Sequence, residues 1–108
     1  MDNKEFEKIV DEQLKYCKEL LIDKSKEYDF GEDRLYSFKA AGKLLKSSPE
    51  EALIGYWTKH VMSIIDMSKC AENFDYEKWT EKITDCINYM LLLKGIIFES
   101  KVNQKKWV

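Results

Sequence analysis

The chain has 108 residues, of which 44% are hydrophobic and 35% are charged, and its formal net charge is −2. This composition is typical of one globular domain rather than of a disordered chain. So small a net charge gives no basis for DNA binding or for attachment to a membrane surface. The longest apolar stretch, 90–98, is too short to span a bilayer.

The three cysteines, Cys17, Cys70 and Cys86, are odd in number and widely spaced. They form no zinc-binding motif, and an odd count argues against the disulfide framework of a secreted protein. The polar N-terminus does not resemble a signal peptide. The sequence therefore predicts a cytoplasmic protein whose thiols are reduced.

Apolar residues recur at helical spacing along most of the chain, and four glycines with one proline leave little turn material. The pattern predicts helices over about residues 4–28, 32–46, 49–70 and 76–99, followed by a basic, polar tail at 100–108. The clearest boundary is Ser48, a predicted N-cap with Pro49 at the first helical position and Glu51 completing a capping box. Asp75 is a second predicted N-cap.

Short connections between four helices predict an all-α, mostly antiparallel bundle that forms a single domain, 1–108. The last predicted helix is apolar nearly all round, at Ile83, Ile87, Met90, Leu91, Leu93, Ile97 and Phe98. A helix that is buried on all sides in so small a bundle predicts a homodimer.

Two narrow polar stripes interrupt the apolar runs of the third and fourth predicted helices. They consist of Lys59, Ser63 and Asp66 in one helix, and of Glu81, Asp85 and Asn88 in the other. Residues three, four or seven positions apart share one helix face, so the two stripes meet if these helices pack together.

The carboxylates of these stripes are candidate ligands for Mg²⁺, which prefers oxygen donors. The candidates are Asp66, Glu81 and Asp85, with Glu27 as a possible fourth ligand. The alternative is that Asp66 pairs with Lys59 on its own helix, while Glu81 and Asp85 face solvent or Lys82.

Asn88 extends its stripe into the most hydrophobic part of the chain, where an unsatisfied amide is costly. His60 is the only histidine. Its neighbour Lys59 favours phosphate binding over general-base catalysis, because one cation disfavours a second charge beside it. The alternative for a single histidine is an ordinary core or boundary residue.

A basic and aromatic cluster spans the connection between the first two predicted helices. It consists of Lys24, Lys26, Tyr28, Arg34, Phe38 and Lys39. Cations for phosphate oxygens and rings for a base would make a nucleotide pocket. The alternative is a solvated basic surface with two core aromatics.

Several segments occur together in a characteristic order: KSKEY at 24–28, DRLYSFKAA at 33–41, SPEEAL at 48–53, KH at 59–60, DM at 66–67, and WTEKITD at 79–85 followed by NY at 88–89. This order resembles a family of small phage and prophage proteins of low-GC Gram-positive bacteria, over residues 20–99. More remotely, the layout is similar to the MazG-type all-α nucleoside-triphosphate pyrophosphohydrolases.

That second resemblance implies a helical, usually dimeric enzyme that holds Mg²⁺ with an ExxE and an ExxD motif. This sequence has no ExxE, and its last helix has Glu81-x-x-x-Asp85 instead. Two-metal phosphate chemistry needs several carboxylates, so the departure weakens the catalytic interpretation.

The leading hypothesis is a phage-encoded, cytoplasmic protein that sequesters a small or cyclic nucleotide without cleaving it, as a sponge for an immune signal of the host cell. One alternative is a Mg²⁺-dependent, MazG-like nucleotide pyrophosphohydrolase. Another is a helical protein–protein adaptor, in which polar contacts fix helix register and Trp107 anchors the partner.

Overall fold

The computed structural model describes residues 1–23 and 33–103. Within these ranges the chain forms four α-helices and no strand, which confirms the predicted all-α fold. The helices are α1 (Asn3–Lys18), α2 (Tyr36–Leu44), α3 (Pro49–Ser68) and α4 (Tyr76–Phe98). Short π-helical turns, Glu19–Asp23 and Glu99–Asn103, extend α1 and α4, and a 3₁₀ turn, Ala71–Asn73, lies between α3 and α4. None of the helices described is long and apolar enough to cross a membrane.

Local side-chain caps set the starts of the two long helices, as the sequence predicts. The Ser48 hydroxyl accepts a hydrogen bond from the Glu51 backbone N–H at 3.1 Å, and the Glu51 carboxylate accepts one from the Ser48 N–H at 3.2 Å. The Asp75 carboxylate accepts a hydrogen bond from the Lys78 N–H at 2.8 Å. Each cap satisfies backbone donors that have no partner inside the helix.

The second helix is shorter than the predicted range 32–46. Its start is delayed because Leu35, with φ −103° and ψ 8°, lies outside the helical region, while the Asp33 carboxylate accepts its backbone N–H at 2.9 Å. The helix ends before Lys46, whose φ of 55° reverses the chain direction. Part of the predicted first helix, 24–28, and the start of the predicted second one at residue 32 lie outside the described residues.

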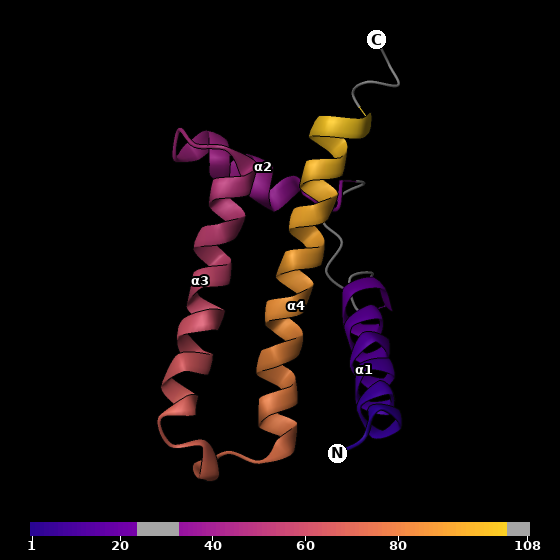
Figure 1. The fold of residues 1–108 in the computed structure, drawn as a ribbon. Helices are drawn as coiled ribbons and strands as arrows, with labels where there is room; N and C mark the ends of the chain where they lie inside the picture. The colour runs from indigo at the N-terminus through magenta and orange to yellow at the C-terminus, as the bar shows by residue number, and fades with distance from the viewer. Residues whose placement is uncertain (24–32, 104–108) are drawn as a thin grey trace.

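The two long helices, α3 and α4, run antiparallel side by side, and α2 crosses one end of this hairpin (Figure 1). Their junction forms the main core, in which Leu35, Phe38, Leu53 and Ile96 are buried. Gly42 allows α2 to approach the start of α3 closely, because a Cβ there would lie 2.9 Å from the Ser48 carbonyl carbon.

The first helix, α1, packs against α4 near the other end of the hairpin (Figure 1). Gln13 Nε2 donates a hydrogen bond to Thr84 Oγ1 at 2.7 Å, and the Thr84 hydroxyl donates to the Thr80 carbonyl oxygen at 2.6 Å. Thr84 and Cys17 are fully buried at this contact. Both α1 and α2 are therefore attached to the same hairpin, α1 through α4 and α2 through both of its helices.

Candidate functional site

The second predicted polar stripe contacts α3 through Asp85, but its partner is His60, the neighbour of Lys59, and not a residue of the first stripe. His60 Nδ1 lies 3.7 Å from Asp85 Oδ2, and both side chains are half-buried between α3 and α4. This distance is too long for a direct hydrogen bond, so the pair is an electrostatic contact that depends on the charge of the imidazole.

Aromatic rings from three helices surround this contact. The His60 and Tyr89 rings lie 4.9 Å apart with a tilt of 34°. Phe38 of α2 packs edge-on against Tyr89 at 6.3 Å and against Tyr56 at 6.0 Å. We call Phe38, Tyr56, His60 and Tyr89 the aromatic cluster. It combines apolar ring faces with three polar edges, a combination suited to a flat ligand that also forms hydrogen bonds.

A cavity of about 270 Å³ between α2 and α3 adjoins the cluster. Tyr56 and Lys59 line it together with Ala41, Leu45, Ala52 and Gly55. The space beside Gly55 is open, since a Cβ there would meet no atom within 4 Å. Lys59 is exposed, and its ammonium group has no ion-pair partner among the described residues. An uncompensated cation thus lies at the edge of an apolar hollow.

Asn88 lies one helical turn beyond Asp85 and is the most deeply buried residue of the two stripes. It is 9% exposed, and its Oδ1 has no hydrogen-bond partner in the described part of the chain. An unsatisfied buried acceptor costs about 1–3 kcal/mol. Buried polar groups in native proteins normally have a hydrogen-bond partner, so Asn88 is a candidate for contact with an ordered water, an ion or a ligand.

Burial changes the protonation of two groups at this site. It raises the pKa of the Asp85 carboxyl, and the nearby His60 and Lys82 offset only part of that rise. Burial, with a smaller contribution from the Asp85 charge, also raises the pKa of the Tyr89 hydroxyl. Tyr89 therefore stays a neutral hydrogen-bond donor at physiological pH.

The three predicted Mg²⁺ ligands do not come together. Asp66 is exposed 3.8 Å from Lys69, and Glu81 is exposed 3.7 Å from Lys78. Within residues 1–23 and 33–103, no group of three or more histidine, cysteine, aspartate or glutamate side chains is placed to hold a metal ion. Of these carboxylates only Asp85 faces a polar side chain of α3, and that side chain is His60, which lies outside the first stripe. Glu27 lies outside the described residues.

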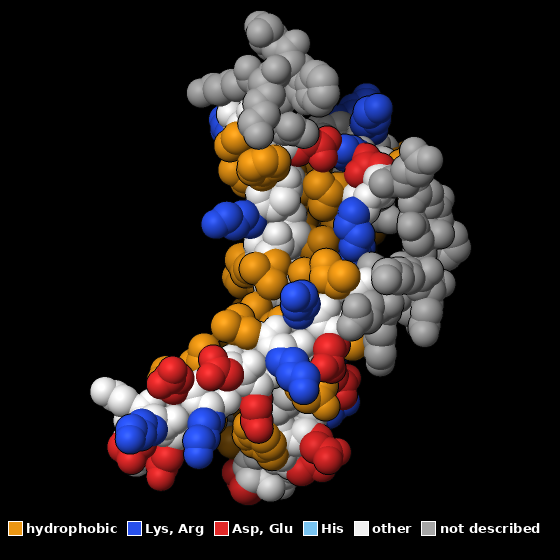
Figure 2. All heavy atoms as spheres, turned by 90° about the vertical axis from the view of Figure 1, so that its right-hand side faces the viewer, with side chains coloured by type: hydrophobic (Ala, Val, Ile, Leu, Met, Phe, Trp, Pro, Cys, Tyr) orange, Lys and Arg blue, Asp and Glu red, His pale blue; other side chains and the backbone are white. Residues whose placement is uncertain are grey.

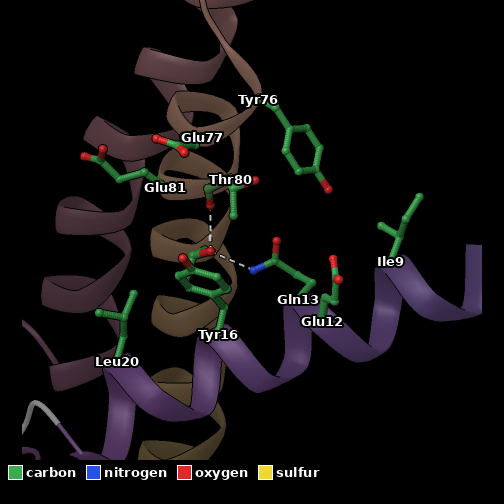
Figure 3. Close-up of a pocket in the computed structure, with 10 residues that line it drawn as sticks. Ile9, Glu12, Gln13, Tyr16, Leu20, Tyr76, Glu77, Thr80 and Glu81 are labelled. Carbon is green, nitrogen blue, oxygen red and sulfur yellow. Dashed lines mark hydrogen bonds between the residues drawn. The ribbon is translucent and has the colours of Figure 1, made fainter.

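A second cavity, of about 440 Å³, lies between α1 and α4, and Glu81 is one of the residues that line it (Figure 3). Glu12 and Glu77 also line it, as do Tyr16 and Tyr76. Figure 3 shows α1 crossing α4 at a steep angle, with these side chains around the opening. Three carboxylates make this cavity unfavourable for a phosphate group, so it is chemically unlike the hollow beside Lys59.

The predicted cations near the first helix connection have partners within the chain. Arg34 Nη2 donates a hydrogen bond to the Leu21 carbonyl oxygen at 3.3 Å. Lys39 Nζ lies 2.6 Å from Asp33 and 2.5 Å from Glu99, and these hydrogen bonds raise the pKa of Lys39 and lower that of Asp33. Both cations therefore join helix ends. The other predicted members of this cluster, Lys24, Lys26 and Tyr28, lie outside the described residues.

Sequence reasoning did not select Tyr56 and Tyr89 as site residues. Tyr89 directly follows Asn88, and Tyr56 lies one turn before Lys59 and His60. An aromatic residue flanking a polar stripe on each of two adjacent helices was the available signal.

Comparison of the chain with protein-family models, with curated proteins and with solved structures gives no match.

Proposed function

We propose that this protein binds a small phosphate-bearing nucleotide where α2 meets the α3–α4 hairpin, and holds it without cleaving it. The observation that carries the proposal is the buried Asn88 carbonyl group, which has no partner in the described chain and lies next to the ring of Tyr89 in sequence. A ligand with an N–H donor on a flat ring would satisfy that acceptor and use the neighbouring ring surfaces.

The aromatic cluster supports recognition of a nucleobase. Its rings come from three different helices, so their relative positions are fixed by the packing of the hairpin against α2. Stacking of a base on an aromatic side chain contributes about 1–3 kcal/mol. Tyr56 is 44% exposed and is thus the ring most accessible to a ligand.

Lys59 supports recognition of the phosphate. It is the predicted phosphate ligand that lines a cavity and has no competing carboxylate in the described chain, whereas Lys39 is held by two carboxylates. A hydrogen bond to a charged group contributes about 1.5–3 kcal/mol. Loss of Lys59 is therefore expected to weaken nucleotide binding by about 10-fold to 100-fold.

Sequestration is favoured over hydrolysis by the arrangement of the carboxylates. Pyrophosphate cleavage with Mg²⁺ requires several carboxylates that hold ions and orient water. Asp66 and Glu81 are each next to a lysine on the surface, and neither contacts His60 as Asp85 does. Retention of an intact nucleotide, as in a sponge that captures a signalling molecule of host immunity, is the corresponding function.

The first experiment identifies the ligand. The protein is incubated with a mixture of nucleoside mono-, di- and triphosphates and cyclic dinucleotides, with and without Mg²⁺, and is then washed and denatured. We expect mass spectrometry to recover one intact nucleotide class. Failure of every nucleotide to bind contradicts the proposal, and Mg²⁺-dependent release of pyrophosphate supports the hydrolase instead.

The second experiment locates the site with variants. Lys59→Gln should weaken binding of the recovered nucleotide but not of its nucleoside, whereas Lys94→Gln, an exposed lysine of α4, should change neither. Asn88→Leu should abolish binding and leave the protein as stable or more stable, because it removes an unsatisfied buried amide. A merely structural Asn88 would instead lose stability while binding followed only the folded fraction.

A further inference from the structure

The face of the α3–α4 hairpin that is turned away from α2 carries a set of exposed apolar side chains. We call it the open face, and it consists of Ile54, Met62 and Ile65 of α3 with Ile83 and Ile97 of α4. Ile65 is 43% exposed and Ile97 is 39% exposed. Single exposed apolar residues are ordinary, but a contiguous patch on two adjacent helices marks an interaction surface.

Helix geometry places these residues opposite the attached elements. Successive residues turn by about 100° around an α-helix. Ile65 follows Tyr56, which contacts α2, by nine residues and so points to the opposite side of α3. Ile97 follows Thr84, which contacts α1, by thirteen residues and lies about 140° away from it on α4. The side of the hairpin that α1 and α2 cover, which we call the covered side, is therefore distinct from the open face.

The chain exposes more surface than a compact monomer of the same mass. Such a monomer of 12.8 kDa exposes about 6,300 Å², whereas this chain exposes 8736 Å². Surface of this extent is consistent with helix faces that have no partner within the chain.

The N-terminal part of α1 also carries exposed apolar side chains. Phe6 is 56% exposed and Leu14 is 55% exposed, although they share a helical stripe with Cys17, which is buried against α4. Figure 2 shows hydrophobic side chains gathered along a hollowed edge of the molecule when it is viewed from the side of α1. One end of the α1 stripe is thus covered within the chain, and the other end is available to a partner.

The chemistry of the open face fits a second copy of this chain. The positions that follow it at helical spacing are all uncharged: Ile54, Thr58, Val61 and Ile65 on α3, and Ile83, Cys86, Met90, Leu93 and Ile97 on α4. In a two-fold dimer each residue can meet its own equivalent, so like charges would repel across the axis. The centre of the open face carries no charge and so avoids that repulsion, whereas the exposed Lys94 lies at its border beside Ile83. An apolar centre is typical of homodimer interfaces.

We propose that two copies of this chain associate through their open faces, so that the two α3–α4 hairpins form one four-helix bundle and α1 of each copy packs on the other. The covered side, with the aromatic cluster and Lys59, then faces away from the dimer axis in both copies. The proposal does not depend on nucleotide binding, because no residue of the open face belongs to the nucleotide site.

Analytical ultracentrifugation of the full chain tests this interface. We expect the wild type to sediment at twice the mass of one chain from about 1 to about 100 µM. Ile65→Glu should sediment as a single chain with its helical circular dichroism retained, whereas Leu44→Glu, at an 83% exposed position of α2, should remain dimeric. A wild type that is monomeric at the highest concentration overturns the proposal and assigns the open face to a different partner.

A dimeric Ile65→Glu would likewise overturn the assignment of this face. If that variant loses its helical circular dichroism, Ile65→Ala tests the interface instead, because it removes apolar contact without inserting a charge. We then expect the dimer dissociation constant to rise by at least about 10-fold. An unchanged constant means that another surface forms the dimer.

Discussion

The two sides of the α3–α4 hairpin differ in chemistry although the same two helices form them. One side is covered by α1 and α2 and holds the half-buried His60–Asp85 contact, the buried Asn88 and the aromatic rings. The opposite side has exposed isoleucines and no charged residue at its central positions. Polar groups are thus placed where the chain itself shields them, and apolar groups are left where a partner can cover them.

This difference explains why the last helix is apolar nearly all round. A helix packed on one side needs one apolar stripe, whereas α4 contacts α1, α2 and α3 and still presents Ile83 and Ile97 to the outside. The narrow stripe of Glu81, Asp85 and Asn88 interrupts this apolar surface on the covered side, and Lys94 interrupts it beside Ile83. Its polar residues are therefore a local departure from packing requirements, and such departures occur at functional sites.

The largest loss of stability is expected from a substitution that removes a core contact on the covered side. Leu53 is 0% exposed and packs with Leu35, Phe38 and Ile96. Leu53→Ala should reduce the free energy of unfolding by about 2–5 kcal/mol, because it leaves a cavity that the helices cannot fill.

The matched control is Leu44→Ala, the same substitution at a position that is 83% exposed. It should change the free energy of unfolding by less than about 0.5 kcal/mol. Chemical denaturation at one fixed protein concentration measures both. Equal effects of the two substitutions would mean that the covered side is not the core of the protein.

Alanine substitutions at two glycines of the covered side should have smaller effects on stability, and these effects should have opposite signs. Gly42→Ala brings a Cβ within 2.9 Å of the Ser48 backbone and 3.0 Å of the Pro49 nitrogen, so α2 must move away from α3. Such overpacking costs about 1–3 kcal/mol. Gly55→Ala meets no atom within 4 Å and should stabilise α3 by about 0.5–1 kcal/mol.

The Gly55→Ala variant also sharpens the functional comparison, because its methyl group enters the hollow beside Lys59. It should therefore raise the melting temperature and weaken nucleotide binding together. Thermal denaturation measures the melting temperature and a titration on the same sample measures nucleotide binding, and a neutral substitution would change neither. A stabilised variant with unchanged binding would exclude the hollow from the nucleotide site.

Local sequence signals predicted the starts of α3 and α4, because the groups that cap these helices are close together in sequence. Ser48 and Glu51 cap a helix three residues apart, and Asp75 caps another in the same way. The start of α2 was predicted too early because Leu35, a good helix former, is held outside the helix by Asp33. Element boundaries without a strong cap depend on such single contacts.

The site was predictable only in part, because its geometry depends on contacts between residues that are far apart in sequence. The two polar stripes were visible from their spacing, yet the contact that forms joins Asp85 to His60, which belongs to neither stripe's expected pairing. Arg34 and Lys39 looked available for phosphate, but their partners, the Leu21 carbonyl and Glu99, come from other helices. No periodicity in the sequence reports which charges pair across helices.

The smallest expected effect on stability comes from Asp85, whose carboxylate is half-buried on the covered side. Burial raises the pKa of Asp85 above its ordinary value of 3.8 in the folded protein, in spite of the opposing effect of His60. The folded state thus favours the protonated carboxyl group. Its contribution to stability is fully present below pH 3.8 and is lost as the pH rises through the folded pKa.

Asp85→Asn removes the buried charge and keeps the shape of the side chain. The variant should therefore melt at a higher temperature than the wild type at pH 7, and the difference should disappear towards pH 3.8. Asp66→Asn, at an exposed position of α3, is the control and should shift the melting temperature little at either pH. A lower melting temperature of Asp85→Asn at neutral pH would mean that attraction to His60 outweighs the cost of burial, and the covered side would then hold an ion pair rather than an uncompensated carboxylate.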